Sequence, residues 1–237
     1  MRPSISIVIP AYNEENRLGP SLDKIRRYLD SSDWASPEIV VVNDGSRDRT
    51  SEVARAGGAR VLENPGNRGK GYTVRHGMLE AKGEWILYTD ADLSTPIEEL
   101  EKVWSAVGRE RAQVAIGSRA VDRSLVGVHQ PLVRELSGRF FNLVMRLITG
   151  LPYRDTQCGF KLFDRATARD VFSRQQLEGF GFDVEVLFIA RRLKRRGIEV
   201  AVRWDNVEGT KVSLWSGAKA FSDPIMVRLN ALKGKYR

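Results

Sequence analysis

The most informative segment of this 237-residue chain is EWILYTDAD, at residues 84–92. An apolar run is followed there by two aspartates, Asp90 and Asp92, that are separated by one residue. A run without alternating polar residues is typical of a strand buried on both faces of a sheet. Alternate residues of an extended segment point the same way, about 6–7 Å apart. Both carboxylates can then reach one divalent cation, and hard oxygen ligands favour Mg²⁺ or Mn²⁺.

Similar apolar runs recur along the first half of the chain, with helical spacing between them. The predicted strands are Ile5–Ile9, Ile39–Val42, Ala59–Leu62, Trp85–Tyr88 and Val114–Ile116. The predicted helices are Arg17–Leu29, Arg47–Ala56, Gly71–Lys82 and Glu98–Val107. Repeated strand–helix–strand order predicts an α/β fold with a mostly parallel central sheet flanked by helices. Because no internal repeat or low-complexity linker interrupts the chain, we expect a single domain.

The second half of the chain is less regular. We predict a loop at Ala120–Pro131 and then a helix at Arg134–Ile148, which is dense in large apolar residues interspersed with arginines. Further predicted elements are a strand at Phe160–Phe163, helices at Ala166–Ser173 and Val184–Arg196, a strand at Ile198–Trp204, and a basic tail containing Lys219, Arg228, Lys233, Lys235 and Arg237. The Arg134–Ile148 pattern fits an interfacial helix on anionic lipid, and equally a packed helix with snorkelling arginines.

Polar side chains follow three of the predicted strands. These segments are residues 10–15, 43–48 and 89–92. In parallel α/β sheets, ligands bind at the carboxyl ends of the strands. One such end is explained equally well by a turn or a helix cap, but three together favour a ligand site.

The segment GNRGKG, at residues 66–71, is rich in glycine and precedes a predicted helix. Its spacing does not match a Walker loop, and it does not directly follow the first strand as a dinucleotide fingerprint does. Arg68 and Lys70 at a helix entry can still meet an anion. A plain helix entry explains the segment equally well.

Taken together, residues 10–14, 42–46, 66–71 and 90–94 resemble the successive motifs of family 2 inverting glycosyltransferases, which have the Rossmann-like GT-A fold. The resemblance covers nearly the whole chain. Residues 155–161, 181–185 and 204–213 narrow it to the branch of dolichyl- and polyprenyl-phosphate sugar transferases. Residues 207–213 resemble the glucosyltransferases of that branch. The mannose synthases often carry a glutamine where this chain has Ser94. This difference weakens the prediction of a mannosyl transfer.

The resemblance implies a role for each matching residue. Pro10, Tyr12 and Glu14 would border the nucleotide, and Asp44 would hold the uracil or ribose with Lys70 nearby. Asp90 and Asp92 would face the diphosphate through Mg²⁺ or Mn²⁺, with Asp92 the more direct metal ligand. The remaining candidates lie in the second half and are Arg119 for the acceptor phosphate, Lys161 and Lys211 as further cations, Ser213 in the final motif, and Asp155 and Asp183 as orienting groups or a base. Those two aspartates are equally explained as structural partners of the cations.

The implied reaction transfers a hexose, glucose in our prediction, from a UDP-sugar to a polyprenyl phosphate. An acceptor phosphate monoester has a second pKa near ~6 and is largely a dianion at neutral pH, so no strong general base is required. We expect residues 1–118 to bind the nucleotide-sugar and residues 119–237 to bind the acceptor. Within the same family, a GDP-mannose donor or a soluble acceptor is the alternative.

Composition narrows the possible partners and the compartment. The formal net charge is +8, which attracts polyanions, and the single cysteine, Cys158, excludes an internal disulfide. No apolar run reaches the ~18 residues of a membrane span, and the N-terminus lacks the pattern of a signal peptide. We therefore expect a cytoplasmic protein, peripheral on the cytoplasmic face of a membrane, held there either by a membrane-anchoring partner or by the predicted helix and basic tail.

Two other functional classes fit the sequence less well. A nucleic-acid binder is suggested by the charge alone, but strand ends rich in aspartate argue against it, so we expect no nucleic-acid partner. A nucleotidyltransferase usually carries a glycine-rich loop directly after its first strand, where this chain has Pro10 to Glu14.

Overall fold

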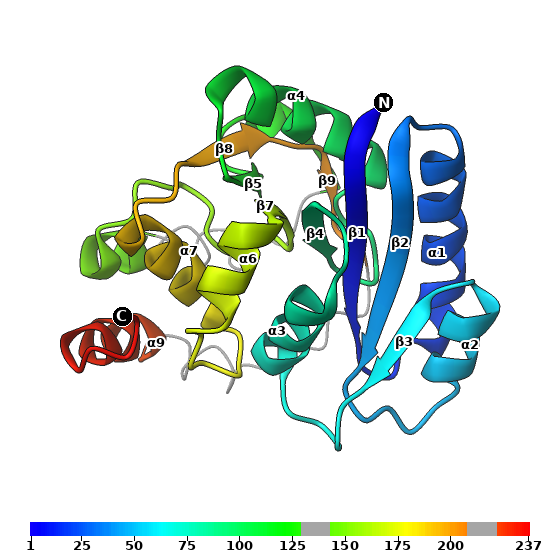
Figure 1. Cartoon of the computed structure of the whole chain (residues 1–237), viewed down its shortest axis with the longest axis horizontal. Coiled ribbons are helices and arrows are strands. Elements are labelled where there is room, and N and C mark those ends of the chain that lie inside the picture. The colour runs from blue at the N-terminus through cyan, green and yellow to red at the C-terminus, as the bar shows by residue number, and fades with distance from the viewer. Residues whose placement is uncertain (129–142, 208–221) are drawn as a thin grey trace.

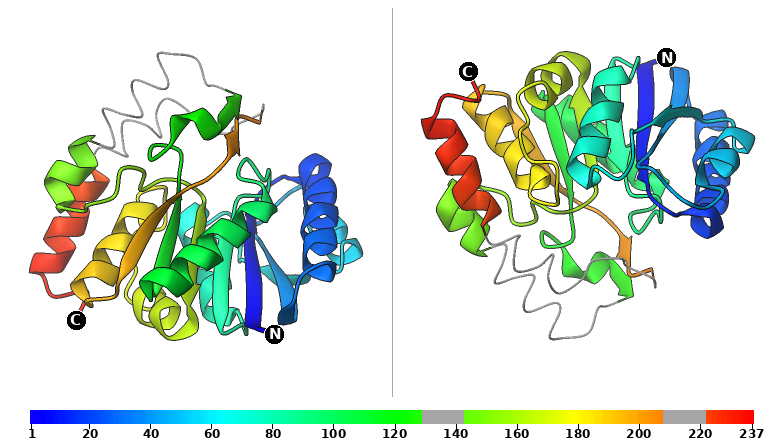
Figure 2. Two further views of the ribbon diagram at one scale, coloured as in Figure 1. Left: turned by 90° about the horizontal axis from the view of Figure 1, so that it is seen from above. Right: turned by 90° about the horizontal axis from the view of Figure 1, so that it is seen from below.

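The computed structural model describes residues 1–128, 143–207 and 222–237. A seven-stranded sheet in the order β3-β2-β1-β4-β7-β5-β8 forms its centre, with helices on both faces (Figures 1 and 2). Its strands are β1 Arg2–Ala11, β2 Trp34–Asn43, β3 Arg60–Glu63, β4 Trp85–Thr89, β5 Val114–Ser118, β7 Phe160–Asp164 and β8 Gly197–Ala201. The helices are α1 Glu15–Asp30, α2 Thr50–Ala56, α3 Lys70–Glu80, α4 Leu100–Glu110, α6 Arg165–Phe172, α7 Phe182–Arg192 and α9 Asp223–Leu232.

The sheet is mostly parallel, as predicted. Strands β1, β2, β3 and β4 pair in parallel, and so do β5 and β8. Strand β7 is the exception, because it lies antiparallel between β4 and β5. Strands from both halves of the chain therefore share one sheet, and the fold is a single α/β domain.

The unbroken hydrophobicity of the strands is explained by burial on both faces. Val8, Val40 and Val42 belong to the core beneath α3, α6 and α7. Ile7, Ile9 and Val41 belong to the opposite core, beneath α1, α2 and α4. Since side chains alternate along a strand, two cores require apolar residues at every position.

Three sequence predictions need correction. The segment Ala120–Pro131 is not simply a loop, because it contains the 3₁₀ turn η2 (Arg123–Leu125) and strand β6 (Val126–Val128). The predicted strand Ile198–Trp204 is divided between β8 and a second strand, β9 (Trp204–Asp205), which pairs in parallel with β6. The chain leaves the main sheet there because the Asp205 amide donates to the Ser94 carbonyl at 2.8 Å.

The third correction concerns the C-terminus, where the predicted basic tail forms helix α9 instead. Pro224, Val227, Asn230 and Ala231 are buried there at helical spacing, a pattern hidden in the sequence by the further apolar residues between them. Residues 143–149 are helical, as predicted for the end of Arg134–Ile148, and the rest of that prediction lies outside the described residues. Among the described helices, none combines the length and apolarity needed to cross a bilayer.

Helix α3 carries Lys70 at its first position, and its distance from the sheet depends on a glycine. A Cβ added at Gly77 would lie 2.4 Å from Val8 Cγ1 and 2.8 Å from Val42 Cγ2. The close approach of α3 to β1 and β2 therefore requires a residue without a side chain.

We predict that Gly77→Ala destabilises the protein by about 1–3 kcal/mol, because overpacking a tight core outweighs the gain in helix propensity. The matched control is Gly108→Ala in α4, where an added Cβ meets nothing within 4 Å. That substitution should stabilise the protein by roughly 0.5–1 kcal/mol. Urea unfolding measures both values, and equal effects of the two substitutions would contradict the packing argument.

Candidate active site

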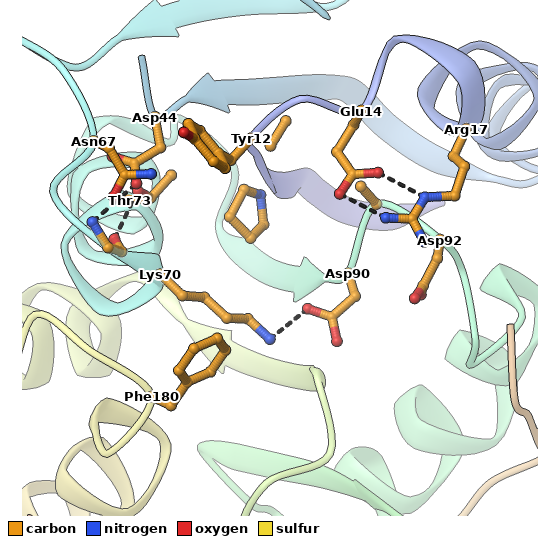
Figure 3. Close-up of a pocket in the computed structure, with 14 residues that line it drawn as sticks. Tyr12, Glu14, Arg17, Asp44, Asn67, Lys70, Thr73, Asp90, Asp92 and Phe180 are labelled. Carbon is orange, nitrogen blue, oxygen red and sulfur yellow. Dashed lines mark hydrogen bonds and ion pairs between the residues drawn. The ribbon is translucent and has the colours of Figure 1, made fainter. Parts of the chain in front are cut away.

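A cavity of about 420 Å³ opens where β1, β2 and β4 end (Figure 3). Its lining consists of Pro10, Ala11, Tyr12, Glu14, Arg17, Asp44, Asn67, Gly69, Lys70, Thr73, Asp90, Ala91, Asp92 and Phe180. The three polar strand ends therefore converge on one site, as the sequence predicted.

The carboxylate of Asp44 shapes one wall of this cavity. It is 4% exposed and accepts hydrogen bonds from the backbone amides of Arg68 and Gly69, both at 2.9 Å, and from Asn64 Nδ2 at 2.8 Å. Gly69 has a φ of +99°, and its Cβ position would lie 2.7 Å from the Glu178 carbonyl oxygen. Asp44 thus folds the 66–71 loop back onto β2. Its predicted contact with uracil or ribose stays a prediction, since both carboxylate oxygens already accept bonds from the chain.

An ion pair joins the loop to the aspartates at the end of β4. Lys70 Nζ lies 2.6 Å from Asp90 Oδ1, as Figure 3 shows. Burial lowers the pKa of Lys70, but the carboxylates of Asp90 and Asp183 more than offset this and raise it above its ordinary value. Lys70 is therefore charged at neutral pH and occupies one side of the Asp90 carboxylate.

Asp90 and Asp92 lie in a turn rather than in the extended segment that we predicted from their spacing. Strand β4 ends at Thr89, and the Leu93 amide donates to the Asp90 carbonyl at 3.1 Å. Leu93 has a φ of +48°, a conformation that most side chains avoid. The turn still directs both carboxylates into the cavity.

The position of Asp90 depends on a glycine from another strand. The Asp90 amide donates to the Gly159 carbonyl at 3.2 Å, just before β7. A Cβ at Gly159 would lie 2.1 Å from Asp90 Oδ2, so only glycine leaves room for the carboxylate.

The two aspartates suit a divalent cation shared with phosphate. Burial raises the pKa of Asp92, and the neighbouring Asp90 charge raises it further. A cation would relieve this repulsion. Within the described residues no group of three or more His, Cys, Asp or Glu side chains could hold a metal. Mg²⁺ and Mn²⁺ commonly bind through one or two carboxylates plus substrate phosphates and water, so this donor set fits them.

Arg119 is held rigidly by Asp155. Its Nε donates to Asp155 Oδ2 at 2.6 Å and its Nη2 donates to Oδ1 at 2.8 Å. The Arg119 guanidinium also lies over the Trp204 ring, 5.3 Å from the ring centroid. Burial raises the pKa of Asp155, but Arg119 outweighs it and holds the pKa below its usual value. Asp155 therefore remains ionised and positions Arg119.

Lys161 and Asp183 form a second ion pair, this one fully inside the protein. Lys161 is 0% exposed and Asp183 is 3% exposed. Lys161 Nζ also donates to the Cys158 carbonyl at 2.7 Å, and the Tyr88 hydroxyl donates to Asp183. Burial and the adjacent Asp183 charge raise the pKa of Tyr88 well above its ordinary value. The pair links β7 to α7, and the Tyr88 hydroxyl ties it to β4 two residues before Asp90.

The sequence model that describes "Glycosyl transferase family 2" matches residues 6–172. The chain belongs to glycosyltransferase family 2. Among its relatives, a dolichyl-phosphate beta-glucosyltransferase from Drosophila melanogaster is 38% identical over 98% of this chain and 77% of its own length. The Homo sapiens enzyme of that name is 36% identical over the same shares of both chains. The family that the sequence motifs predicted is therefore confirmed, and the protein is a glycosyltransferase.

Solved structures confirm the fold. Glucosyl-3-phosphoglycerate synthase from Mycobacterium tuberculosis, crystallised with Mn²⁺, UDP and glucosyl-3-phosphoglycerate, superposes with a TM-score of 0.70 at 21% identity. That match covers 96% of this chain and 79% of the synthase. Mannosyl-3-phosphoglycerate synthase from Rubrobacter xylanophilus has a TM-score of 0.71 at 19% identity, covering 98% of this chain and 75% of the synthase.

The structure brings most of the predicted site residues of this glycosyltransferase together. Seven of them line the cavity: Pro10, Tyr12, Glu14, Asp44, Lys70, Asp90 and Asp92. Asp155 and Asp183 each pair with a cation, which is the structural alternative that the sequence had left open. Lys161 is buried in such a pair, so in this arrangement it does not reach an acceptor. Lys211 and Ser213 lie outside the described residues.

Sequence reasoning missed several residues of the glycosyltransferase site. Arg17 lines the cavity and pairs with Glu14 through two bonds of 2.8 Å. Its position three residues after Glu14, at the start of a helix, was the available signal. Phe180 reaches the cavity from the segment before α7, and no local pattern predicts that contact.

We predict that Lys161→Met destabilises the protein by about 3–5 kcal/mol, because it leaves the Asp183 carboxylate buried without its cation. Asp183→Asn in the same chain should recover part of this loss, since it removes the unpaired charge. Urea unfolding of the two single variants and the double variant measures the coupling. Strictly additive losses would show that the two side chains do not stabilise each other.

Proposed function

We propose that this glycosyltransferase moves glucose from UDP-glucose to a dolichyl or related polyprenyl phosphate, inverting the anomeric carbon. The observation that carries the proposal is the cavity at the ends of three strands. Asp90, Asp92 and Lys70 all line this cavity, and Lys70 pairs with Asp90 there. The relatives named dolichyl-phosphate beta-glucosyltransferase support this choice of sugar and acceptor, because they match 98% of this chain.

The donor half of the proposal rests on the charges of the cavity. All lining residues except Phe180 precede residue 119, which supports our assignment of residues 1–118 to the nucleotide-sugar. Asp90 and Asp92 would hold Mg²⁺ or Mn²⁺, and when bound the cation neutralises charge that develops on the departing diphosphate. Lys70 would turn from Asp90 to the diphosphate, because the two negative charges of the diphosphate attract its ammonium more strongly than a carboxylate that already binds a metal.

The acceptor half of the proposal rests on Arg119. Its bonds to Asp155 use Nε and Nη2, so within the described part of the chain Nη1 is available to an acceptor phosphate. The phosphate is a dianion at neutral pH and attacks without losing a proton, so Asp155 acts by orienting Arg119 rather than as a base. Since the acceptor is a lipid, the protein would work at a membrane. The face that we propose is the cytoplasmic one.

The test is an assay with purified protein, UDP-glucose, Mg²⁺ or Mn²⁺, and polyprenyl phosphate in detergent, with UDP release and glycolipid both quantified. We expect glycolipid to form, and we expect Asp92→Asn to lower the rate at least about a hundredfold, because a catalytic metal supplies several kcal/mol of charge stabilisation. Asp122→Asn, at an aspartate that does not line the cavity, is the control and should leave the rate unchanged.

Parallel reactions with GDP-mannose, and with 3-phosphoglycerate as a soluble acceptor, separate the alternatives. Transfer to 3-phosphoglycerate alone would overturn the lipid acceptor and retain the donor site. Transfer only from GDP-mannose would overturn the choice of UDP-glucose. Release of pyrophosphate instead of UDP would indicate a nucleotidyltransferase.

The Lys70–Asp90 pair leads to a prediction about metal binding. Lys70→Met should strengthen Mn²⁺ binding in the absence of donor, because it frees one side of Asp90 and removes a repelling charge. The same variant should weaken UDP binding in the presence of Mn²⁺, because the ammonium that meets the diphosphate is lost. Electron paramagnetic resonance of free Mn²⁺ and calorimetry with UDP measure these two affinities.

Lys102→Met is the matched control, since it removes the same charge from an exposed lysine whose partner, the buried Glu99, lies outside the cavity lining. It should change neither affinity. If Lys70→Met left Mn²⁺ affinity equal to that of the control, Lys70 and the metal would not share Asp90.

A further inference from the structure

Exposed large apolar side chains gather in two helical segments of the second half of the chain. The described residues contain nine such side chains, and six of them are Leu143, Leu147, Ile225, Met226, Leu229 and Leu232. Leu147 is 74% exposed and Leu232 is 84% exposed. Single exposed apolar residues are common, but a group confined to one region marks an interaction surface. We call these six residues the apolar face.

Helix α9 has two apolar sides, and only one of them belongs to the core. Val227 and Ala231 are buried in the core that also contains α7. Ile225, Met226, Leu229 and Leu232 follow the spacing i, i+1, i+4 and i+7, which places them together on the outward side. The outward side is therefore a second stripe, and packing against the described residues does not account for it.

The two segments adjoin one another and are held in place. Arg228 Nε donates to the Ile148 carbonyl at 2.6 Å, which joins α9 to residues 143–149. Figure 2 shows the two segments side by side in both views. The Tyr236 hydroxyl donates to Glu185 of α7 at 2.6 Å and fastens the chain after α9. The apolar face is thus a preformed part of the surface.

Cationic side chains border the apolar face. Lys233, Lys235 and Arg237 are exposed just after α9, and Arg191 and Arg192 are exposed at the end of α7. The one carboxylate of α9 is Asp223, in its first turn. An apolar stripe bordered by lysine and arginine is the pattern of a helix that lies in the interface of an anionic bilayer.

We propose that the apolar face docks on an anionic lipid bilayer, with α9 and residues 143–149 lying along the headgroup boundary. Charge decides between this partner and a second copy of the chain, because two cationic rims on molecules of net charge +8 would repel each other. The inference deepens the proposed function, since a lipid-linked acceptor has to be reached from a membrane surface.

The test measures co-sedimentation of the full chain with phosphatidylcholine vesicles, with and without phosphatidylserine, across a range of salt concentrations. We expect binding that requires phosphatidylserine and weakens as salt rises. The double variant Ile225→Gln/Leu229→Gln should lower the partition coefficient about tenfold or more, because two apolar side chains no longer enter the bilayer. Val121→Gln is the matched control, since Val121 is 40% exposed outside the apolar face.

Circular dichroism and UDP binding establish that the variants are folded. Equal vesicle binding by the double variant and the control would overturn the proposal. A second result would also overturn the proposal. In that case light scattering would show a dimer that the double variant abolishes, and vesicles would bind neither the unmodified protein nor the double variant.

The vesicles contain neither donor nor polyprenyl phosphate, so this result is independent of the transfer assay. Vesicle binding without transfer in detergent would support the docking surface and overturn the proposed function. Transfer in detergent without vesicle binding would support the proposed function and overturn the docking surface.

Discussion

The buried ion pair between Lys161 and Asp183 is the interaction on which the site depends. It joins β7 to α7, and the Tyr88 hydroxyl connects both to β4. Lys161 also holds the Cys158 carbonyl, next to the glycine whose missing side chain leaves room for Asp90. Ions lose several kcal/mol of hydration when they are buried, so such a pair persists only with well-placed partners. The antiparallel strand β7 thereby places the acidic turn.

Charges are also paired in and near the cavity, where the cations are more exposed than Lys161. Lys70 and Asp90 neutralise each other in the cavity, and Arg119 and Asp155 do so outside its lining. Asp92 and Asp155 differ in whether a ligand could still neutralise their charge. Asp92 carries a raised pKa and a like-charged neighbour, so it gains from a cation, whereas Asp155 is already satisfied by Arg119.

The sequence pattern predicted those elements whose apolar residues recur at a regular short-range spacing. The five strands of the first half were found because burial on two faces demands apolar residues at every position. The convergence of residues 10–15, 43–48 and 89–92 followed from parallel strand order alone. Helix α9 was missed because apolar residues on two of its sides hide the single stripe expected of a surface helix.

The amino-acid order was sufficient for the α/β class, the glycosyltransferase family and seven of the cavity residues between Pro10 and Asp92, because these depend on short-range periodicity and on motifs with fixed spacing. Only the tertiary structure separated the second-half candidates into roles. Lys161 is buried while Arg119 is partly exposed, and Asp155 and Asp183 turn out to be partners of these cations. The reason is physical: the charge state and reach of an ionisable side chain depend on burial and on partners as far as 95 residues away.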